Sequence, residues 1–235
     1  YLVGAEIGTN KEDLDRARSL LDNGVDLLVI DTAHGHSAKV LSVLSKLKKI
    51  NNQITICVGN IATGEAAKKL YNSGADIIKV GIGPGSICTT RMVAGIGVPQ
   101  ITAIMEVKKA LNKKKIKIIS DGGIKFSGDI AKALAAGADA IMMGSIFAGT
   151  DESPGKKFKM NGKIYKQYRG MGSIGAMSSG SANRYFQKNF KDKSKFVPEG
   201  VEGRVEYKGS VSKIIYQLQG GLRSSMGYIG AKNLN

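Results

Sequence analysis

One short phrase occurs three times in this sequence and constrains the fold more than any other feature. In each copy a glycine, a small apolar residue and an aspartate stand between a helix-like segment and an apolar run; the copies are Gly24-Val25-Asp26, Gly74-Ala75-Asp76 and Gly137-Ala138-Asp139. A glycine directly after a helix is typical of a helix end, and the apolar run indicates a buried strand. Such alternation predicts a parallel sheet with right-handed crossovers.

Six expected strands follow this rhythm in the first 145 residues, and amphipathic helices separate them. The expected strands cover residues 3–7, 27–30, 54–58, 76–80, 116–119 and 140–143, and the expected helices cover residues 11–22, 37–50, 63–72, 102–114 and 127–136. A (β/α)8 TIM barrel needs eight strands, so this fold class requires that the first two strands are missing from the chain. A doubly wound open sheet is the alternative fold.

The rhythm stops after Thr150. Asn161-Gly162 is a strong signal for a two-residue turn and predicts a hairpin between Phe158 and Tyr168. The rest of this region is too long for an ordinary connection and predicts a functional flap. We therefore expect residues 1–150 and 210–235 to form the barrel, and residues 151–209 to form a hairpin and flap inserted after its last strand. A last helix is expected over residues 212–218.

The strongest chemical signal is the stretch Gly81-Ile-Gly-Pro-Gly-Ser-Ile-Cys-Thr-Thr-Arg91. Its three glycines and its proline exclude helix and strand there. Consecutive amides in such a loop can cradle an anion, and carbonyls can face a cation. Cys88 lies among these dipoles and near Arg91, which favours an activated nucleophile over a merely buried thiol.

Polar residues also follow the other expected strands, which in a barrel is the catalytic face. These segments are Asp31-Thr32-Ala33-His34, Gly59-Asn60, Asp121-Gly122-Gly123 and Gly144-Ser145. The last two segments would follow strands seven and eight, where barrels commonly bind phosphate. Tight turns are the alternative explanation for their glycines. The segment 170–175 matches a dinucleotide-binding pattern, but no long helix follows it, so we reject that interpretation.

Composition limits the class of partner. The chain has 35 Lys and Arg residues against 19 Asp and Glu, a formal net charge of +16, which raises the question of nucleic acid. The lysines are scattered and do not alternate with aromatic residues, so solvated faces and attraction of a small anionic substrate are the better explanations. The two cysteines form no disulfide framework, which favours a reducing, cytoplasmic location. No apolar run approaches the ~20 residues of a membrane span.

These motifs, in this order, resemble those of the IMP dehydrogenase family over essentially the whole chain. The likeness is carried by Gly81–Arg91, Asp121–Ile124, Gly144-Ser145, Tyr168–Ser173, Arg184-Tyr185 and Pro198-Glu199-Gly200. The Cys88 loop alone is shared with GMP reductase, the near alternative, whereas the flap with Arg184-Tyr185 is a dehydrogenase feature. The resemblance implies a TIM barrel, a homotetramer and the reaction of IMP, NAD+ and water to XMP and NADH. A nucleic-acid-binding or nucleotide-sensing protein without turnover is the more distant alternative.

The resemblance also implies roles for single residues. Cys88 would attack C2 of the purine and hold a covalent thioimidate, and Arg184 would be the base toward water, with Tyr185 and Thr90 orienting that water. Substrate contacts would come from Ser86, Asp121, Gly122, Gly123, Gly144, Ser145, Tyr168, Arg169, Gly170, Met171, Gly172 and Glu199. NAD contacts would come from Asp31, Thr32, Ala33, Asn60, Gly81, Ile82 and Gly83, and potassium would face carbonyls of Gly83, Gly85 and Cys88. Because the family's regulatory domains and C-terminal segment are not in this sequence, we expect a longer protein.

Overall fold

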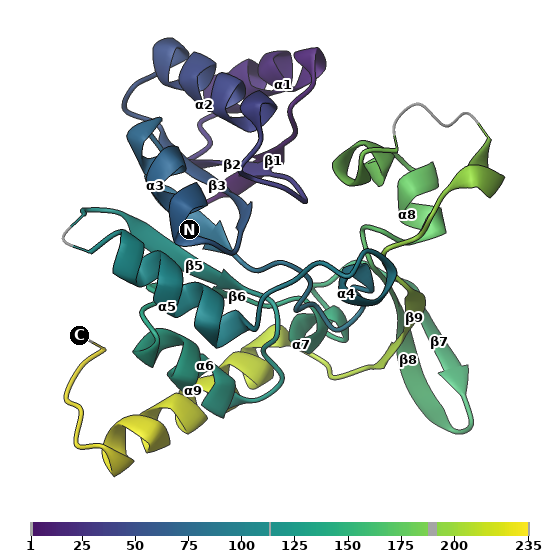
Figure 1. Ribbon diagram of the computed structural model, residues 1–235. Helices are drawn as coiled ribbons and strands as arrows, with labels where there is room; N and C mark the ends of the chain where they lie inside the picture. Colours follow the sequence, from purple (N-terminus) through teal and green to yellow (C-terminus); the bar gives the residue numbers. More distant parts are fainter. Residues whose placement is uncertain (1, 113, 188–191, 235) are drawn as a thin grey trace. The chain divides into compact units, whose positions relative to one another are not determined.

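A parallel sheet of six strands forms the first part of the computed structural model, which describes residues 2–112, 114–187 and 192–234 (Figure 1). The strands are β1 (Gly4–Ile7), β2 (Leu27–Asp31), β3 (Thr55–Ile61), β4 (Ile77–Val80), β5 (Lys117–Asp121) and β6 (Ala140–Met142). The helices among them are α1 (Lys11–Asp22), α2 (Ala38–Ile50), α3 (Gly64–Asn72), α4 (Thr90–Val93), α5 (Gln100–Ala110) and α6 (Ser127–Ala135). Each of the six predicted strands is confirmed, whereas the short helix α4 was not predicted.

The strands neighbour one another in chain order, β1-β2-β3-β4-β5-β6, and β1 to β5 pair in parallel. A doubly wound sheet reverses its strand order at a switch point, whereas a barrel adds each new strand on the same side of the last. Since the described strands show no reversal, the doubly wound alternative is wrong. The sheet is consistent with part of a TIM barrel.

The repeated glycine–aspartate phrase has the same structure in all three places. Its glycine has a positive φ, from 76° at Gly24 to 115° at Gly137, which suits glycine at a helix end. The aspartate N–H donates to the carbonyl of one residue of the neighbouring strand segment, and its carboxylate accepts that residue's N–H. Both bonds measure 2.8–3.0 Å in each pair: Asp26 with Val3, Asp76 with Ile56, and Asp139 with Ile118. Each phrase therefore fixes the register of a new strand.

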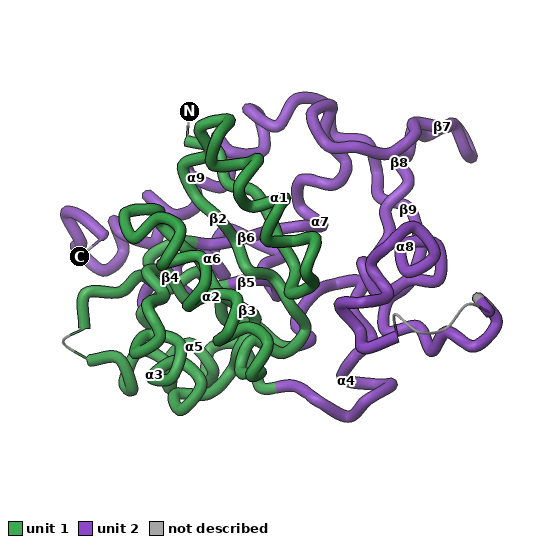
Figure 2. The backbone as a smooth tube through the Cα atoms, turned by 90° about the horizontal axis from the view of Figure 1, so that it is seen from above, with its two compact units in different colours: residues 1–82, 98–120, 136–140 green, residues 83–97, 121–135, 141–235 purple. Residues whose placement is uncertain are grey.

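The chain divides into two compact units (Figure 2). Unit 1 comprises Tyr1–Ile82, Val98–Ser120 and Ala136–Ala140, and unit 2 comprises Gly83–Gly97, Asp121–Ala135 and Ile141–Asn235. In unit 1, strand β3 is buried from Ile56 to Ile61, as expected for a parallel strand that is covered on both faces. Helix α2 completes this core with Val40, Val43, Leu44 and Leu47.

Unit 2 contains a second, antiparallel sheet in the order β7-β8-β9. Its strands are β7 (Lys157–Met160), β8 (Lys163–Arg169) and β9 (Glu202–Glu206); its further helical segments are α7 (Ser145–Ala148), α8 (Ile174–Ser178), η1 (Ser181–Tyr185), η2 (Lys193–Lys195) and α9 (Val211–Tyr228). The β7–β8 hairpin turns at Asn161 and Gly162, both with positive φ, which confirms the predicted turn. Strand β9 was not predicted, because its charged residues are mostly exposed.

The region predicted as a flap, residues 151–209, thus contributes a sheet as well as short helices, and its residues 188–191 lie outside the described part of the chain. The last helix was predicted too short, because α9 continues through Gly220 and Gly221. A Cβ atom on Gly221 would lie 2.0 Å from the Ser127 hydroxyl. This glycine therefore permits close packing of α9 on α6 and does not end the helix.

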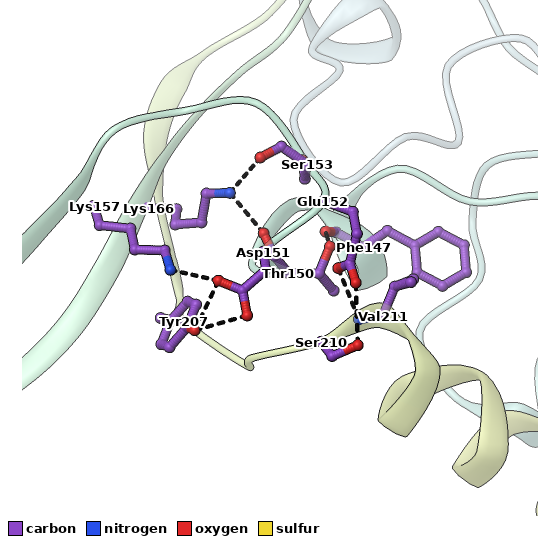
Figure 3. A network of polar contacts seen from close by, with 10 residues as sticks. All are labelled: Phe147, Thr150, Asp151, Glu152, Ser153, Lys157, Lys166, Tyr207, Ser210 and Val211. Carbon is purple, nitrogen blue, oxygen red and sulfur yellow. Dashed lines mark hydrogen bonds and ion pairs between the residues drawn. The ribbon is translucent and has the colours of Figure 1, made fainter.

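A buried lysine joins the second sheet to the loop before it (Figure 3). The Lys166 side chain on β8 is 2% exposed, and its ammonium donates to the carbonyls of Thr150 and Ser153. On the exposed side of this loop, the Asp151 carboxylate accepts a hydrogen bond from the Tyr207 hydroxyl at 2.8 Å. These contacts tie β8 and the end of β9 to one loop.

The same loop caps helix α9 (Figure 3). The Glu152 carboxylate accepts hydrogen bonds from the Val211 N–H at 2.8 Å and from the Ser210 hydroxyl at 3.0 Å. The bond from Val211 is the main reason why the pKa of Glu152 is lowered. A carboxylate at a helix N-terminus satisfies free N–H groups and complements the helix dipole.

Candidate active site

The glycine-rich loop that carries Cys88, residues 83–91, is held by backbone hydrogen bonds within unit 2. We call these bonds the backbone ladder; they join this thiol loop to residues 199–201, and those residues to residues 170–172. Its four bonds run from the Thr89 N–H to the Glu199 carbonyl (2.9 Å), from the Val201 N–H to the Ile87 carbonyl (3.0 Å), from the Glu199 N–H to the Gly172 carbonyl (3.0 Å) and from the Gly170 N–H to the Val201 carbonyl (2.9 Å). Two segments distant in sequence from the thiol loop thereby hold it, residues 199–201 directly and residues 170–172 through them.

Glycines permit the close approach of these segments. A Cβ atom on Gly172 would lie 2.9 Å from the Glu199 carbonyl carbon, and a Cβ on Gly200 would lie 3.1 Å from the Ser173 nitrogen. Real Cβ contacts to backbone this short require the chain to shift. The glycines of segment 170–175 therefore serve backbone packing. Helix α8, which begins at Ile174, has only five residues, in agreement with our rejection of the dinucleotide-binding pattern.

A chain of hydrogen bonds leads away from the Cys88 thiol. Its Sγ lies 3.2 Å from the Thr90 hydroxyl oxygen, and the Thr90 hydroxyl donates to Glu199 Oε2 at 2.8 Å. Cys88 itself is only partly buried, so a ligand can reach the sulfur. Hydrogen bonds thus connect a nucleophile, a hydroxyl and a carboxylate in series, and a proton can move along such a series.

The structure also brings Arg184 and Tyr185, on η1, to this group. Burial raises the pKa of Tyr185; its hydrogen bond and proximity to the Arg184 guanidinium lower that pKa, and the nearby Cys88 and Glu199 raise it. The tyrosine is therefore a neutral hydroxyl at physiological pH and can donate a hydrogen bond. A Cβ on Gly172 would lie 3.0 Å from the Tyr185 ring, so the ring lies against the backbone ladder.

A second group of predicted residues meets at Tyr168, a half-buried residue near the end of β8. Burial raises the pKa of this tyrosine, and a hydrogen bond with Ser86 of the thiol loop opposes the change. A Cβ on Gly144 would lie 2.9 Å from the Tyr168 hydroxyl, so this glycine leaves the hydroxyl room. A Cβ on Gly122 would lie 3.0 Å from the Pro84 ring in the thiol loop. The predicted substrate residues of unit 2 thus gather from loops after β5, β6 and β8.

The remaining predicted substrate residues flank these groups. Asp121 ends β5, Gly123 has a φ of 79°, Ser145 begins α7, and Arg169 ends β8 ahead of Met171. Their positions follow from the strands that precede them. The binding roles of these residues stay predictions.

The predicted NAD residues before Gly83 all belong to unit 1, at the carboxyl ends of β2, β3 and β4. The Thr32 N–H donates to the Gly59 carbonyl at 2.9 Å, and the Asn60 side-chain amide donates to the Gly81 carbonyl at 2.7 Å. Asp31 ends β2, and its carboxylate lies 3.1 Å from the ammonium of Lys79. Ala33 and Ile82 follow these strand ends in the chain. The structure therefore gathers most of the predicted cofactor residues on one unit.

Lys79 is the site residue that the sequence analysis missed. It lies on β4 within the apolar run Ile77–Val80 and is 1% exposed. A charged side chain inside an otherwise apolar strand is rarely buried without a partner, and that irregularity was the available signal.

Metal ligands of the usual kinds are absent from the described residues: no three His, Cys, Asp or Glu side chains converge there. The predicted potassium ligands are carbonyls. The Gly85 carbonyl accepts the Cys88 N–H at 3.1 Å, which leaves it a second lone pair, and Gly83 has a φ of 76°. Backbone oxygens of such a loop suit a hard cation, so the donor set fits potassium.

Fold and site together define a parallel (β/α) protein with a candidate cysteine nucleophile in a glycine-rich loop. The chain matches the family model described as "IMP dehydrogenase / GMP reductase domain" over residues 1–235, and it belongs to that family. It is 60% identical over 233 residues to inosine-5'-monophosphate dehydrogenase of Staphylococcus saprophyticus, 57% over 233 residues to that of Aquifex aeolicus and 56% over 232 residues to that of Rhizobium tropici.

These alignments cover 99% of this chain but only 48%, 47% and 47% of the three relatives, respectively. The chain therefore spans about half the length of the curated relatives that it matches. Among its described helices, none combines the length and the apolar character that crossing a membrane requires.

Proposed function

We propose that this protein converts IMP, NAD+ and water to XMP and NADH through a covalent intermediate on Cys88. The observation that carries the proposal is the line from the Cys88 sulfur through the Thr90 hydroxyl to the Glu199 carboxylate. Its membership of the family and the names of its relatives support the same chemistry.

Two steps follow from this arrangement. The Cys88 thiol gives up its proton through the Thr90 hydroxyl toward the Glu199 carboxylate, its sulfur bonds to C2 of the purine, and the hydride lost from C2 leaves a thioimidate on the enzyme. Bound NAD+ supplies the hydride acceptor. Water then attacks C2 and releases XMP and the free thiol. Arg184 is assigned as the base toward this water, and the neutral Tyr185 hydroxyl and Thr90 orient it.

The substrate would be held by two groups in unit 2. Tyr168, Ser86 and Gly144 lie together, and we assign them to the phosphate with Ser145 and Gly123, whereas Asp121 is assigned to the ribose hydroxyls. The turn amides and hydroxyls are groups that bind phosphate well. Glu199 is assigned to the purine edge, since its carboxylate is linked to Cys88 through the Thr90 hydroxyl. Arg169 to Gly172 would complete the contacts.

The cofactor would be held by the strand ends of unit 1. The Asp31 side chain is 16% exposed, and its carboxylate suits the hydroxyls of a ribose. The glycine-rich backbone of residues 81–83 allows a flat ring to approach closely. Potassium would be bound by the carbonyls of Gly83, Gly85 and Cys88.

Larger features of the family belong to the same proposal. The protein would complete its barrel with strands outside this sequence, assemble as a homotetramer, act in the cytoplasm and move residues 151–209 as a catalytic flap. In this scheme residues 1–150 and 210–235 belong to the barrel.

The test is a turnover assay in which purified protein receives IMP and NAD+. We expect NADH absorbance to rise, and mass spectrometry of quenched protein to find a purine adduct on the peptide that contains Cys88. Consumption of NADPH with GMP, and no NADH from IMP, would instead indicate GMP reductase. Binding of RNA without turnover, with a steep salt dependence, would exclude both reactions.

A further inference from the structure

Lys79 is a buried charge at a strand position where an apolar residue would have no desolvation cost. Its ammonium lies 3.1 Å from Asp31 Oδ1 and 2.5 Å from Asn60 Oδ1. Removing an ammonium from water is expensive, and its attraction to partners offsets that expense only with good geometry. An apolar residue would therefore serve the core better, so the function of the ammonium lies in what it contacts.

The sheet register makes this contact possible. Asp31 on β2 is paired with Gly59 on β3, and Gly59 is paired with Lys79 on β4, so the three lie in one row. Residues in one row point to the same face of a sheet. A Cβ on Gly59 would lie 2.7 Å from both the Cβ and the carbonyl oxygen of Lys79. The missing side chain of Gly59 opens the path along which Lys79 reaches Asp31.

Lys79 also determines the orientation of Asn60. The register of β3 shifts between Gly59 and Ile61, so Asn60 is an extra residue in the strand, and such bulges redirect side chains. An ammonium can only donate hydrogen bonds, so the oxygen of the Asn60 amide must face Lys79. The amide nitrogen then faces the Gly81 carbonyl, to which it donates at 2.7 Å.

We propose that Lys79 is a positioning residue for the dinucleotide: it orients the Asp31 carboxylate and the Asn60 amide, and through Asn60 it fixes the Gly81 carbonyl at the end of β4. This inference rests on the proposed function, which assigns Asp31, Asn60 and Gly81 to the cofactor. Lys79 itself need not touch the ligand. It acts through three groups that lie at the ends of three neighbouring strands, β2, β3 and β4.

The test measures NAD+ affinity directly by calorimetry, so it does not depend on turnover. Lys79→Met keeps the length and apolar stem of the side chain and removes the charge. We expect a Kd for NAD+ raised about ten- to hundredfold, the usual effect of losing hydrogen bonds to a charged group. The Kd for IMP should change less than about threefold. In turnover, the KM for NAD+ should rise more than kcat falls.

Lys48→Met is the matched control. Lys48 pairs with Asp76 at 2.7 Å in the same unit, but at the amino-terminal ends of the strands. It should lower the melting temperature as Lys79→Met does and leave the Kd for NAD+ unchanged. An equal loss of affinity in both variants would reduce Lys79 to a structural role and overturn the inference, as would unaltered affinity in Lys79→Met.

Two further results keep the test decisive. If Lys79→Met does not fold, Lys79→Arg and Lys79→Gln replace it: the charged variant should bind NAD+ more tightly than the neutral one, and the reverse order contradicts the inference. If the wild-type protein binds NAD+ without forming NADH from IMP, the proposed function fails while the positioning role is still measured. A wild-type protein that binds no dinucleotide overturns both.

Discussion

The two units of this protein build their parts of the candidate site by opposite means. In unit 1, regular strands align Asp31 and Lys79 in one row, and the side chains bond to one another. In unit 2, the thiol loop has no regular partner strand, and backbone bonds from two distant segments hold it. The first arrangement depends on particular side chains, whereas the second depends on glycines that allow backbones to meet. Loss of a side chain should therefore damage the site in unit 1, whereas addition of a side chain to a glycine should damage it in unit 2.

The two cysteines give the sharpest form of this comparison. Cys88→Ala should lower the rate of NADH formation at least about a thousandfold, because no neighbouring residue can take over the role of the missing nucleophile. Its stability should change little, since Cys88 is partly exposed. Cys57→Ala, in the buried centre of β3, should cost about 1 kcal/mol of unfolding free energy and leave the rate near that of wild type. Initial rates and urea unfolding measure both effects; a Cys88 variant with ordinary turnover would contradict the mechanism.

Gly172→Ala tests whether the backbone ladder fixes the thiol. The added methyl group would meet the Glu199 backbone at 2.9 Å, so we expect turnover to fall about a hundredfold by misplacement of the reacting groups. Overpacking should also cost about 1–3 kcal/mol of stability. Gly203→Ala on β9 is the matched control, because nothing lies within 4 Å of its added Cβ. Equal activity of the two variants would show that the ladder is not needed.

The sequence predicts unit 1 better than unit 2 for a physical reason. The glycine–aspartate phrase stands between one helix and the next strand, so each of its three copies marks locally where a strand begins. The ladder joins the thiol loop to residues 199–201, more than a hundred positions away, and those residues to residues 170–172, and no local pattern encodes such pairing. The thiol loop itself was predicted because its glycine density is local. What holds the loop in place was visible only in the structure.

Two details show where local patterns mislead. The paired glycines 220 and 221 suggest a helix end, but Gly221 instead makes room for Ser127 of a neighbouring helix. Lys79 looks like an interruption of an apolar strand, but its ammonium reaches across Gly59 to a neighbour two strands away. In both cases the meaning of the residue depends on a partner that is distant in sequence.

Lys166 extends the comparison to the two buried lysines. It donates to the carbonyls of Thr150 and Ser153, which are not among the predicted site residues, whereas Lys79 lies among the predicted cofactor residues. Lys166→Met should leave these carbonyls without that donor and cost about 1–3 kcal/mol of unfolding free energy, measured in urea. Turnover at saturating substrates should stay within about threefold of wild type. Lys163→Met, on the same strand with a side chain 64% exposed, should change neither quantity; loss of stability in both variants would point to a general charge effect.

The smallest effect is expected at the repeated phrase itself. Burial raises the pKa of Asp139, but hydrogen bonds from the Lys117 ammonium and the Ile118 N–H outweigh it, and the net pKa is lowered. A lowered pKa in the folded state contributes stability above the unfolded value of about 3.9 and loses it as pH falls through the folded value. Asp139→Asn should therefore cost less than about 1 kcal/mol at pH 7, and its gap from wild type should narrow as pH falls below the unfolded value. Urea unfolding across pH, with Asp15→Asn on the exposed face of α1 as the control, measures this gap. A gap that is constant with pH would mean that the carboxylate charge does not help to fix the strand register.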